Sequence, residues 1–345
     1  MAPVVRACQK HQVDHYILHT GQHYSYNMDQ AFFVDLELPP PLHKLEAGSG
    51  PHGEQTARVL AAAERALVQD RPDILLAEGD TNSTLATALA AAKLHIPVGH
   101  VEAGLRSRDK TMPEELNRIL TDHLSNYLFA PTPEARDNLL SENIPEEAVS
   151  VTGNTIVDAV LWASHRVAEK DTTLTRLGLE PRRYFLLTLH RQENADDPER
   201  LANILKGLEL IHREYHLPLV FPIHPRTRKR LDEFGLCLPP CTTILDPMGY
   251  LEFLGLEGAA RLVFTDSGGV QEEACILHVP CVTLRDNTER PETVRVGANA
   301  LAGTAPEAVL EATRRMLSAG AEWSNPFGDG RAAERIMGIV TGDKA

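Results

Sequence analysis

A glycine-rich turn in the second half of the chain has the residue types of an anion-binding site. Ser267 supplies a hydroxyl, and Gly268 and Gly269 let the backbone approach an anion closely. The apolar run that ends at Thr265 indicates a strand, and a helix is expected to begin near Val270. The free N–H groups and the dipole of that helix favour a diphosphate at the turn. The alternative is an ordinary helix N-cap, which serine also favours.

Two further residues extend this candidate site. Glu273 lies one turn into the expected helix, where its carboxylate is placed to accept both hydroxyls of a ribose. The alternative is an exposed glutamate with no ligand. Arg290 follows the next expected strand and is positioned to make a charge-assisted contact with the same phosphates.

Four titratable residues occupy strand ends and helix starts elsewhere in the chain. In open α/β sheets, ligands bind beyond the carboxyl ends of the strands. Asp80 closes one expected strand, although capping the next helix is the alternative role. Glu102 follows a strand and precedes a glycine, so no cap explains it. Glu114 begins a helix, where acidic residues are common, and His190 ends the first strand of the second half. Together these four residues indicate one functional cleft more strongly than any of them does alone.

Two motifs are too incomplete to indicate a cofactor. Gly48-Ser49-Gly50-Pro51-His52-Gly53 matches a dinucleotide fingerprint, but the preceding segment 40–46 is not expected to be a strand. His100-Val101-Glu102 matches half of a zinc deaminase site, but the cysteine-containing half is missing. We therefore expect neither a nicotinamide cofactor nor a metal.

Alternating strands and helices must position these residues. This alternation predicts fold class α/β, with two consecutive doubly wound units and the segment Ile156–Glu169 as a helical bridge. The expected strands are His15–Thr20, Asp73–Glu78, Pro97–Val101, Tyr127–Ala130, Tyr184–Leu189, Leu219–Phe221, Arg261–Thr265 and Pro280–Leu284. The expected helices include Gln55–Val68, Ser83–Lys93, Glu114–Leu124, Pro198–Glu214 and Val270–Leu277.

Composition narrows the classes of partner and compartment. The 48 acidic and 34 basic residues give a formal charge of -14, which argues against nucleic acid or an anionic membrane as partner. The five cysteines show no C-x-x-C spacing, so reduced thiols in a cytoplasmic protein are expected. We find neither a membrane-spanning apolar run nor a signal-peptide pattern.

The motifs taken together resemble the non-hydrolysing UDP-N-acetylglucosamine 2-epimerase family over nearly the whole chain. The matching stretches are His19-Thr20-Gly21-Gln22-His23, His52-Gly53-Glu54-Gln55-Thr56, Gly79-Asp80-Thr81-Asn82-Ser83-Thr84, Gly99-His100-Val101-Glu102-Ala103-Gly104-Leu105-Arg106, Met112-Pro113-Glu114-Glu115-Leu116-Asn117-Arg118, Thr152-Gly153-Asn154-Thr155, Leu189-His190-Arg191, and the Ser267 and Arg290 motifs.

The resemblance implies a glycosyltransferase-B-like fold, with two Rossmann-like domains facing a cleft, and a homodimer. It implies an N-terminal domain at 1–165, a UDP-binding domain at 166–329, and a final helix at 330–345 that crosses back to the first domain. Family members begin with a strand and a basic loop. Because Met1-Ala2-Pro3-Val4-Val5 resembles the inside of the first helix, we expect that strand and loop to be missing, with a weaker first sheet and weaker UDP binding.

The resemblance also implies reversible conversion of UDP-GlcNAc to UDP-ManNAc without a metal or nicotinamide. Loss of UDP from C1 acidifies C2, so 2-acetamidoglucal and UDP are the expected intermediates. The acid–base candidates are Asp80, Glu102 and Glu114, and which of them serves which face of C2 stays open. His190 is expected at the diphosphate or glycosidic oxygen. The expected substrate-binding residues are Ser267, Gly268, Gly269, Glu273, Arg290 and Phe253.

Some bacterial members carry a second UDP-sugar site, for which Gln22, His23 and Arg58 are the candidates. The nearest rival function is a 2-epimerase of a decorated sugar such as UDP-2,3-diacetamido-glucuronic acid. A UDP-sugar glycosyltransferase, a hydrolytic epimerase and an inactive UDP-sugar binder are further alternatives.

Overall fold

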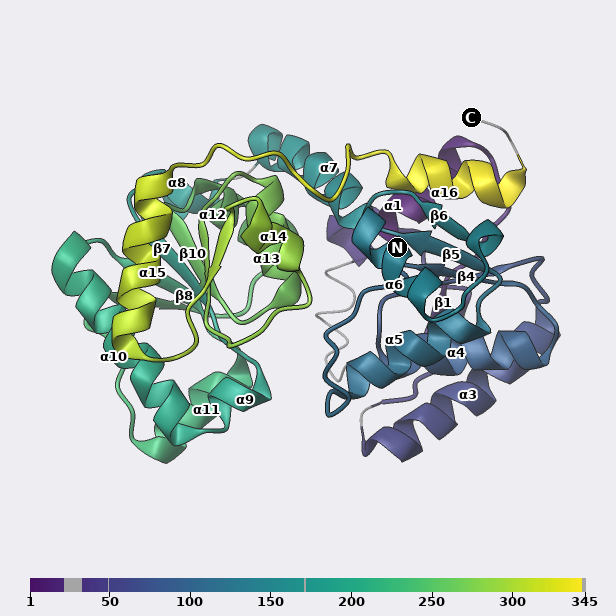
Figure 1. The fold of residues 1–345 in the computed structure, drawn as a ribbon, viewed down its shortest axis with the longest axis horizontal. Coiled ribbons are helices and arrows are strands. Elements are labelled where there is room, and N and C mark those ends of the chain that lie inside the picture. The colour runs from purple at the N-terminus through teal and green to yellow at the C-terminus, as the bar shows by residue number, and fades with distance from the viewer. Residues whose placement is uncertain (22–32, 49, 171, 343–345) are drawn as a thin grey trace. The chain divides into compact units, whose positions relative to one another are not determined.

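The computed structural model describes residues 1–21, 33–48, 50–170 and 172–342. The chain divides into two compact units (Figure 1). Unit 1 comprises residues 1–159 and 327–345, and unit 2 comprises residues 160–326. The boundaries lie a few residues before the expected positions at 165 and 329.

Unit 1 contains two parallel sheets. Its strands are β1 (Leu18–His19), β2 (His43–Lys44), β3 (Leu75–Glu78), β4 (Val98–Val101), β5 (Tyr127–Ala130) and β6 (Val149–Val151). The smaller sheet pairs β1 with β2, and the larger has the order β3-β4-β5-β6. Glu78 pairs with Val101, so the carboxyl ends of β3 and β4 are adjacent. The loops that carry Asp80 and Glu102 therefore leave the sheet side by side.

Strand β2 corrects one sequence-based expectation. Segment 40–46 was not expected to contain a strand, yet His43 and Lys44 pair in parallel with Leu18 and His19. The pairing partner lies far away in the sequence, so no local pattern reveals it. The strand ends before the glycine-rich motif, which therefore does not follow it directly.

The helices of unit 1 cover these sheets with small and branched apolar side chains. They are α1 (Ala2–Lys10), α3 (His52–Gln69), α4 (Asn82–Lys93), α5 (Pro113–Leu124), α6 (Pro133–Ser141), a 3₁₀ turn (Glu146–Ala148), the start of α7 (Thr155–Lys170) and α16 (Ala332–Thr341). Ala63 and Leu67 on α3 pack against Ala88 and Ala91 on α4. These alanines favour helix and permit close packing of the two helices.

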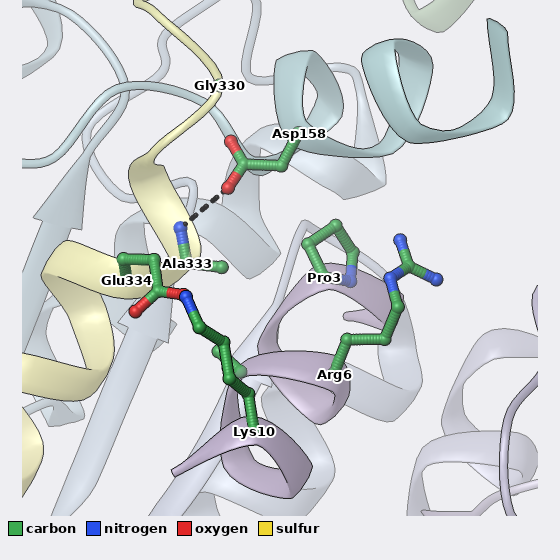
Figure 2. Close-up of a pocket in the computed structure, with 8 residues that line it drawn as sticks. Pro3, Arg6, Lys10, Asp158, Gly330, Ala333 and Glu334 are labelled. Atoms are coloured by element: carbon green, nitrogen blue, oxygen red, sulfur yellow. Dashed lines mark hydrogen bonds and ion pairs between the residues drawn. The ribbon is translucent and has the colours of Figure 1, made fainter. Parts of the chain in front are cut away.

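The C-terminal helix α16 packs against α1 within unit 1. Ile336 and Met337 on α16 join Val4 and Ala7 on α1 in one apolar cluster. Figure 2 shows the pocket at this junction, with Asp158 on α7 directed toward the start of α16. The Asp158 carboxylate accepts hydrogen bonds from two backbone N–H groups of α16, at 3.2 and 3.0 Å. None of the residues that line this pocket is a candidate site residue.

Unit 2 contains one six-stranded parallel sheet with the order β12-β11-β10-β7-β8-β9. The strands are β7 (Phe185–Thr188), β8 (Leu219–Pro222), β9 (Thr242–Leu245), β10 (Leu262–Thr265), β11 (Cys281–Thr283) and β12 (Asn299–Leu301). This is the strand order of a Rossmann fold, whose direction of winding reverses between its first and fourth strands. The reversal falls between β7 and β10, where such folds bind ligands.

Apolar clusters cover both faces of this sheet. One contains Leu187, Phe221 and Phe264, and the other contains Leu186, Val220 and Val263. Successive residues therefore alternate between two buried faces, as expected for a parallel sheet. The helices are the rest of α7, α8 (Thr173–Leu177), α9 (Gln192–Ala195), α10 (Pro198–Tyr215), α11 (Pro225–Phe234), α12 (Tyr250–Ala259), α13 (Gly268–Ile276), α14 (Pro291–Arg295) and α15 (Pro306–Ala319). No helix in the described ranges is long and apolar enough to span a membrane.

Candidate active site

Asp80 lies in the turn between β3 and α4, and it does not cap the helix. The N-cap is Thr81, whose hydroxyl accepts a hydrogen bond from the Thr84 N–H at 3.2 Å. The Asp80 side chain instead pairs with Arg118 at 2.7 Å and stays 30% exposed. The capping alternative is therefore wrong, and Asp80 presents a partly accessible carboxylate.

The neighbouring acids Glu114 and Glu115 differ in environment. Glu115 is 1% exposed and accepts hydrogen bonds from the N–H groups of Ser107 and Arg108 at 2.9 and 2.8 Å. Burial alone would raise the pKa of Glu115, but these N–H groups and Arg118 outweigh burial and lower the pKa. Glu114 is half-buried at the start of α5, and its side chain makes no hydrogen bond or ion pair within the described ranges. Glu115 thus holds the loop that contains Ser107 and Arg108. Glu114 remains the candidate for acid–base catalysis.

Helix α5 also ties its first turns to the Asp80 turn. The Asn117 side chain donates a hydrogen bond to the backbone carbonyl of Asp80 at 2.9 Å. Arg118 links the same turn to Glu115, to which it donates at 2.7 Å. These contacts place the start of α5, which carries Glu114, beside Asp80. Sequence reasoning did not identify Asn117 or Arg118 as site residues.

Glu102 occupies a conformation that is unusual for its residue type. It follows β4 with φ of 70°, in the left-handed region, which costs a non-glycine residue about 1–3 kcal/mol. Gly104 has φ of 83°, and a Cβ there would lie 2.2 Å from the Ala135 carbonyl oxygen, so only glycine fits. A Cβ at Gly79 would lie 3.9 Å from the Glu102 carboxylate. The structure therefore brings Glu102 beside the Asp80 turn.

His190 lies at the winding reversal of unit 2. Thr188 pairs with Thr265, so the loops after β7 and β10 leave the sheet together. The buried carboxylate of Asp266 accepts hydrogen bonds from the His190 and Arg191 N–H groups, at 3.1 and 2.9 Å, and pairs with His190 Nδ1 at 3.2 Å. Asp266 thus orients the His190 ring and leaves Nε2, on a side chain that is 43% exposed, available to a ligand.

Asp266 lies directly after β10 and was not among the predicted site residues. Burial alone would raise the pKa of its carboxyl, but the His190 side chain and the two backbone N–H groups outweigh burial and lower the pKa. An acidic residue directly after a strand is the signal that could have identified it.

The Ser267–Gly269 turn leads directly into α13. Ser267 is the N-cap residue, but its hydroxyl makes no capping hydrogen bond. Gly268 is buried and Gly269 is exposed at the first positions of the helix. Arg290 is 8% exposed, and its Nε lies 2.8 Å from Glu272 on α13. This ion pair holds the guanidinium next to the helix that begins at the turn.

Glu273 is buried, so the exposed alternative is wrong. It is 7% exposed, and burial raises its pKa to about 7. Glu257 on α12 is 0% exposed, and burial, followed by the charge of Glu273, raises its pKa well above the usual range. Phe253, also on α12, is half-buried against the apolar cluster that contains Leu256.

The described structure does not test the second UDP-sugar site, because two of its three predicted residues are outside the described ranges. Gln22 and His23 lie outside the described residues. Arg58 is exposed on α3, where it donates to the Ala47 carbonyl at 2.9 Å and lies 3.7 Å from Glu54. Within the described ranges, no group of three or more histidine, cysteine or acidic side chains is arranged to hold a metal ion.

Comparison with known proteins identifies the family. A family model described as UDP-N-acetylglucosamine 2-epimerase matches residues 6–341. The UDP-N-acetylglucosamine 2-epimerase of Methanocaldococcus jannaschii is 53% identical over 348 residues, which cover 99% of this chain and 95% of that protein. The UDP-2,3-diacetamido-2,3-dideoxy-D-glucuronate 2-epimerase of Pseudomonas aeruginosa is 44% identical over 324 residues, which cover 93% of this chain and 89% of that protein.

A solved structure extends the agreement to the fold. The crystal structure of the Methanocaldococcus jannaschii enzyme in complex with UDP-GlcNAc and UDP has a TM-score of 0.93 and covers 99% of this chain and 95% of that one. The prediction of an α/β fold with two Rossmann-like units, as in glycosyltransferase-B-like proteins, is confirmed. The chain belongs to the UDP-N-acetylglucosamine 2-epimerase family.

Proposed function

We propose that this chain is an isomerase that interconverts UDP-GlcNAc and UDP-ManNAc by inverting the sugar at C2. The observation that carries the proposal is the match to the family over residues 6–341. Support comes from 53% identity to an enzyme solved in complex with UDP-GlcNAc and UDP. The carboxylates of unit 1 and the anion-binding turn of unit 2 have the chemistry that this reaction needs.

Inversion at C2 requires one proton to leave and another to arrive on the opposite face of the sugar. The C2–H bond is not adjacent to a carbonyl, so direct deprotonation is slow. When UDP leaves C1, positive charge develops at C1 and makes the C2 proton acidic. Elimination therefore gives 2-acetamidoglucal and UDP, and re-addition of UDP with protonation of the other face gives the epimer.

The unit 2 residues are suited to the leaving group. In the proposed mechanism, Ser267, the N–H groups at the start of α13 and Arg290 stabilise the diphosphate as its charge develops. His190, held through Nδ1 by Asp266, directs Nε2 to the diphosphate or the glycosidic oxygen. Glu273 accepts hydrogen bonds from the ribose hydroxyls, and Phe253 completes the substrate-binding set.

The unit 1 carboxylates are suited to the proton transfers. We propose that Asp80, Glu102 and Glu114 supply the acid and the base on the two faces of C2. The Asp80 carboxylate is held by Arg118 at 2.7 Å and is 30% exposed, so it is both oriented and accessible to a sugar. The left-handed backbone of Glu102 and the closeness of its carboxylate to Gly79 support a shared role for Glu102 and Asp80.

A second candidate substrate is UDP-2,3-diacetamido-2,3-dideoxy-D-glucuronate. The Pseudomonas aeruginosa relative named for this activity is 44% identical, against 53% for the UDP-N-acetylglucosamine 2-epimerase. The same elimination and re-addition would operate on either sugar, so the two differ only in contacts to the C3 and C6 substituents.

A substrate panel tests the proposal. Purified protein is incubated with each UDP-sugar, products are separated by anion-exchange chromatography, and Asp80→Asn serves as the matched control for contaminating activity. We expect UDP-ManNAc from UDP-GlcNAc, with at least a roughly tenfold higher kcat/KM than for the diacetamido sugar, a difference of about 1.4 kcal/mol. If the diacetamido sugar has the higher kcat/KM, it is the primary substrate instead. If the protein converts neither sugar, the proposal is contradicted.

We further propose that the enzyme acts as a cytoplasmic homodimer and that its product serves cell-surface polysaccharide synthesis. Family membership supports this proposal. Light scattering coupled to size-exclusion chromatography tests the assembly, because a dimer has twice the 38.0 kDa mass of the chain.

A further inference from the structure

His100 is a fully buried histidine on the strand that leads to Glu102. It is the third residue of β4 and is 0% exposed. Its Nδ1 lies 2.6 Å from an oxygen of Asp122, and its Nε2 lies 2.9 Å from the backbone carbonyl oxygen of Gly79. Both ring nitrogens therefore face oxygen atoms at hydrogen-bond distance.

The partners of His100 determine its protonation. A carbonyl oxygen only accepts hydrogen bonds, so Nε2 must carry a hydrogen. The other carboxylate oxygen of Asp122 accepts from the Gly104 N–H at 3.2 Å and pairs with Arg106 at 2.7 Å. These donors favour an ionised Asp122, so Nδ1 carries a hydrogen as well. With both nitrogens protonated, the ring is an imidazolium.

The electrostatics of the surroundings agree with this assignment. Burial alone would lower the pKa of His100, but the hydrogen bond and charge of Asp122 outweigh burial and raise it. Burial alone would raise the pKa of Asp122, but His100 and Arg106 outweigh burial and lower it. The other charged groups that act on His100 are Glu78 at the end of β3 and Glu102 after β4.

The imidazolium connects the two turns that carry the candidate acid–base residues. Through Nε2 it holds Gly79, the residue before Asp80. Through Asp122 it holds Gly104, two residues beyond Glu102. Both glycines have positive φ, of 79° and 83°, so each turn depends on specific backbone contacts. A neutral side chain could preserve one of these hydrogen bonds but not the pair.

We propose that His100 is a permanently charged positioning residue that fixes the Asp80 and Glu102 turns relative to one another. Its importance for turnover rests on the proposed epimerase function, whereas its charge does not. It does not touch the substrate in this proposal. Loss of either hydrogen bond displaces a carboxylate, and a shift of about 1 Å in catalytic geometry can cost roughly 100-fold in rate.

Nitrogen NMR of protein labelled at its histidine rings tests the charge directly. We expect the His100 nitrogens to give a pair of imidazolium shifts at pH 7, where an ordinary histidine with a pKa of about 6.5 is mostly neutral. Loss of this pair in His100→Gln identifies it. If that variant does not fold, the pair of shifts is assigned to His100 by the burial of its ring. His100 is the one buried histidine in the described ranges. A neutral tautomer at pH 7 would overturn the proposal.

Kinetics of two variants test the positioning role. His100→Asn places an amide near Nδ1 and keeps the bond to Asp122, whereas His100→Gln reaches toward Gly79. We expect each to lower kcat by roughly 10- to 100-fold with KM within about threefold. His123→Gln, an exposed change on the same helix as Asp122, is the matched control. Unchanged kcat in both variants would overturn the positioning role. Inactive wild-type protein with an imidazolium His100 would instead refute the epimerase function alone.

Discussion

Burial of Glu273 makes the stability of unit 2 depend on pH in a predictable direction. The pKa of this carboxyl is raised from 4.5 to about 7 by burial. Between these values the folded chain keeps a proton that the unfolded chain has released. Stability therefore falls as pH rises from about 4.5 to about 7, and it is level with respect to this group above that range.

The size of the effect follows from the shift. One pKa unit corresponds to about 1.4 kcal/mol, so the rise to about 7 represents roughly 3 kcal/mol of unfolding free energy. Glu273→Gln replaces the acid with a neutral group of the same shape and removes this dependence. The wild-type free energy of unfolding, relative to that of the variant, should therefore decrease by about 2–3 kcal/mol between pH 5 and pH 8, because the remainder of the decrease lies below pH 5.

Tryptophan fluorescence during urea denaturation measures this difference. The chain has two tryptophans, Trp162 and Trp323, and both belong to unit 2, so the signal follows the unfolding of that unit. Glu311→Gln, an exposed change on α15, controls for loss of a surface carboxylate. Parallel pH dependences for wild type and Glu273→Gln would refute the burial argument.

Three further predictions concern unit 1. Asp80→Asn and Glu114→Gln should each lower kcat by roughly 100- to 10,000-fold. Their affinity for UDP, measured by calorimetry, should stay within about threefold of the wild-type affinity. Wild-type rates in both variants would remove these two residues from the acid–base set. Arg118→Met removes the 2.7 Å pair with Asp80, so kcat should fall by roughly 10- to 100-fold while the circular dichroism spectrum is kept; an unchanged kcat would show that this pair does not orient Asp80. Asp158→Ala should lower the free energy of unfolding by about 1 kcal/mol and accelerate hydrogen exchange in residues 332–341, because it removes the acceptor for two N–H groups at the start of α16. Asp158→Asn should lower the free energy of unfolding by less. Equal exchange in the wild type and both variants would contradict this capping role.

Elements with a clear local pattern of apolar and polar residues can be predicted from the sequence. Strand β5 has the expected bounds, and helices α4 and α5 begin within one residue of the expected positions. Strands β6 and β12 were not predicted, because each has only three residues and one of the three is polar. The polar residue is Ser150 in β6 and Asn299 in β12. Pairing with neighbouring strands stabilises them, and that pairing is not visible locally.

The candidate site likewise contains residues that local sequence predicts and partners that only the folded structure reveals. Motif and position predict Asp80, Glu102, His190 and Ser267, because strand ends can be recognised from local patterns. The Arg118 pair with Asp80 joins residues 38 apart, and the Asp266 contact with His190 joins residues 76 apart. Such contacts exist only after the sheet has formed, so sequence reasoning did not reveal these partners.

Proton NMR of UDP-GlcNAc incubated with this protein in D2O tests the epimerase proposal most directly. We predict loss of the sugar C2 proton signal together with new UDP-ManNAc resonances, because each passage through 2-acetamidoglucal exchanges that proton for deuterium. A C2 proton that persists while UDP remains bound to the protein would contradict epimerisation by elimination and re-addition.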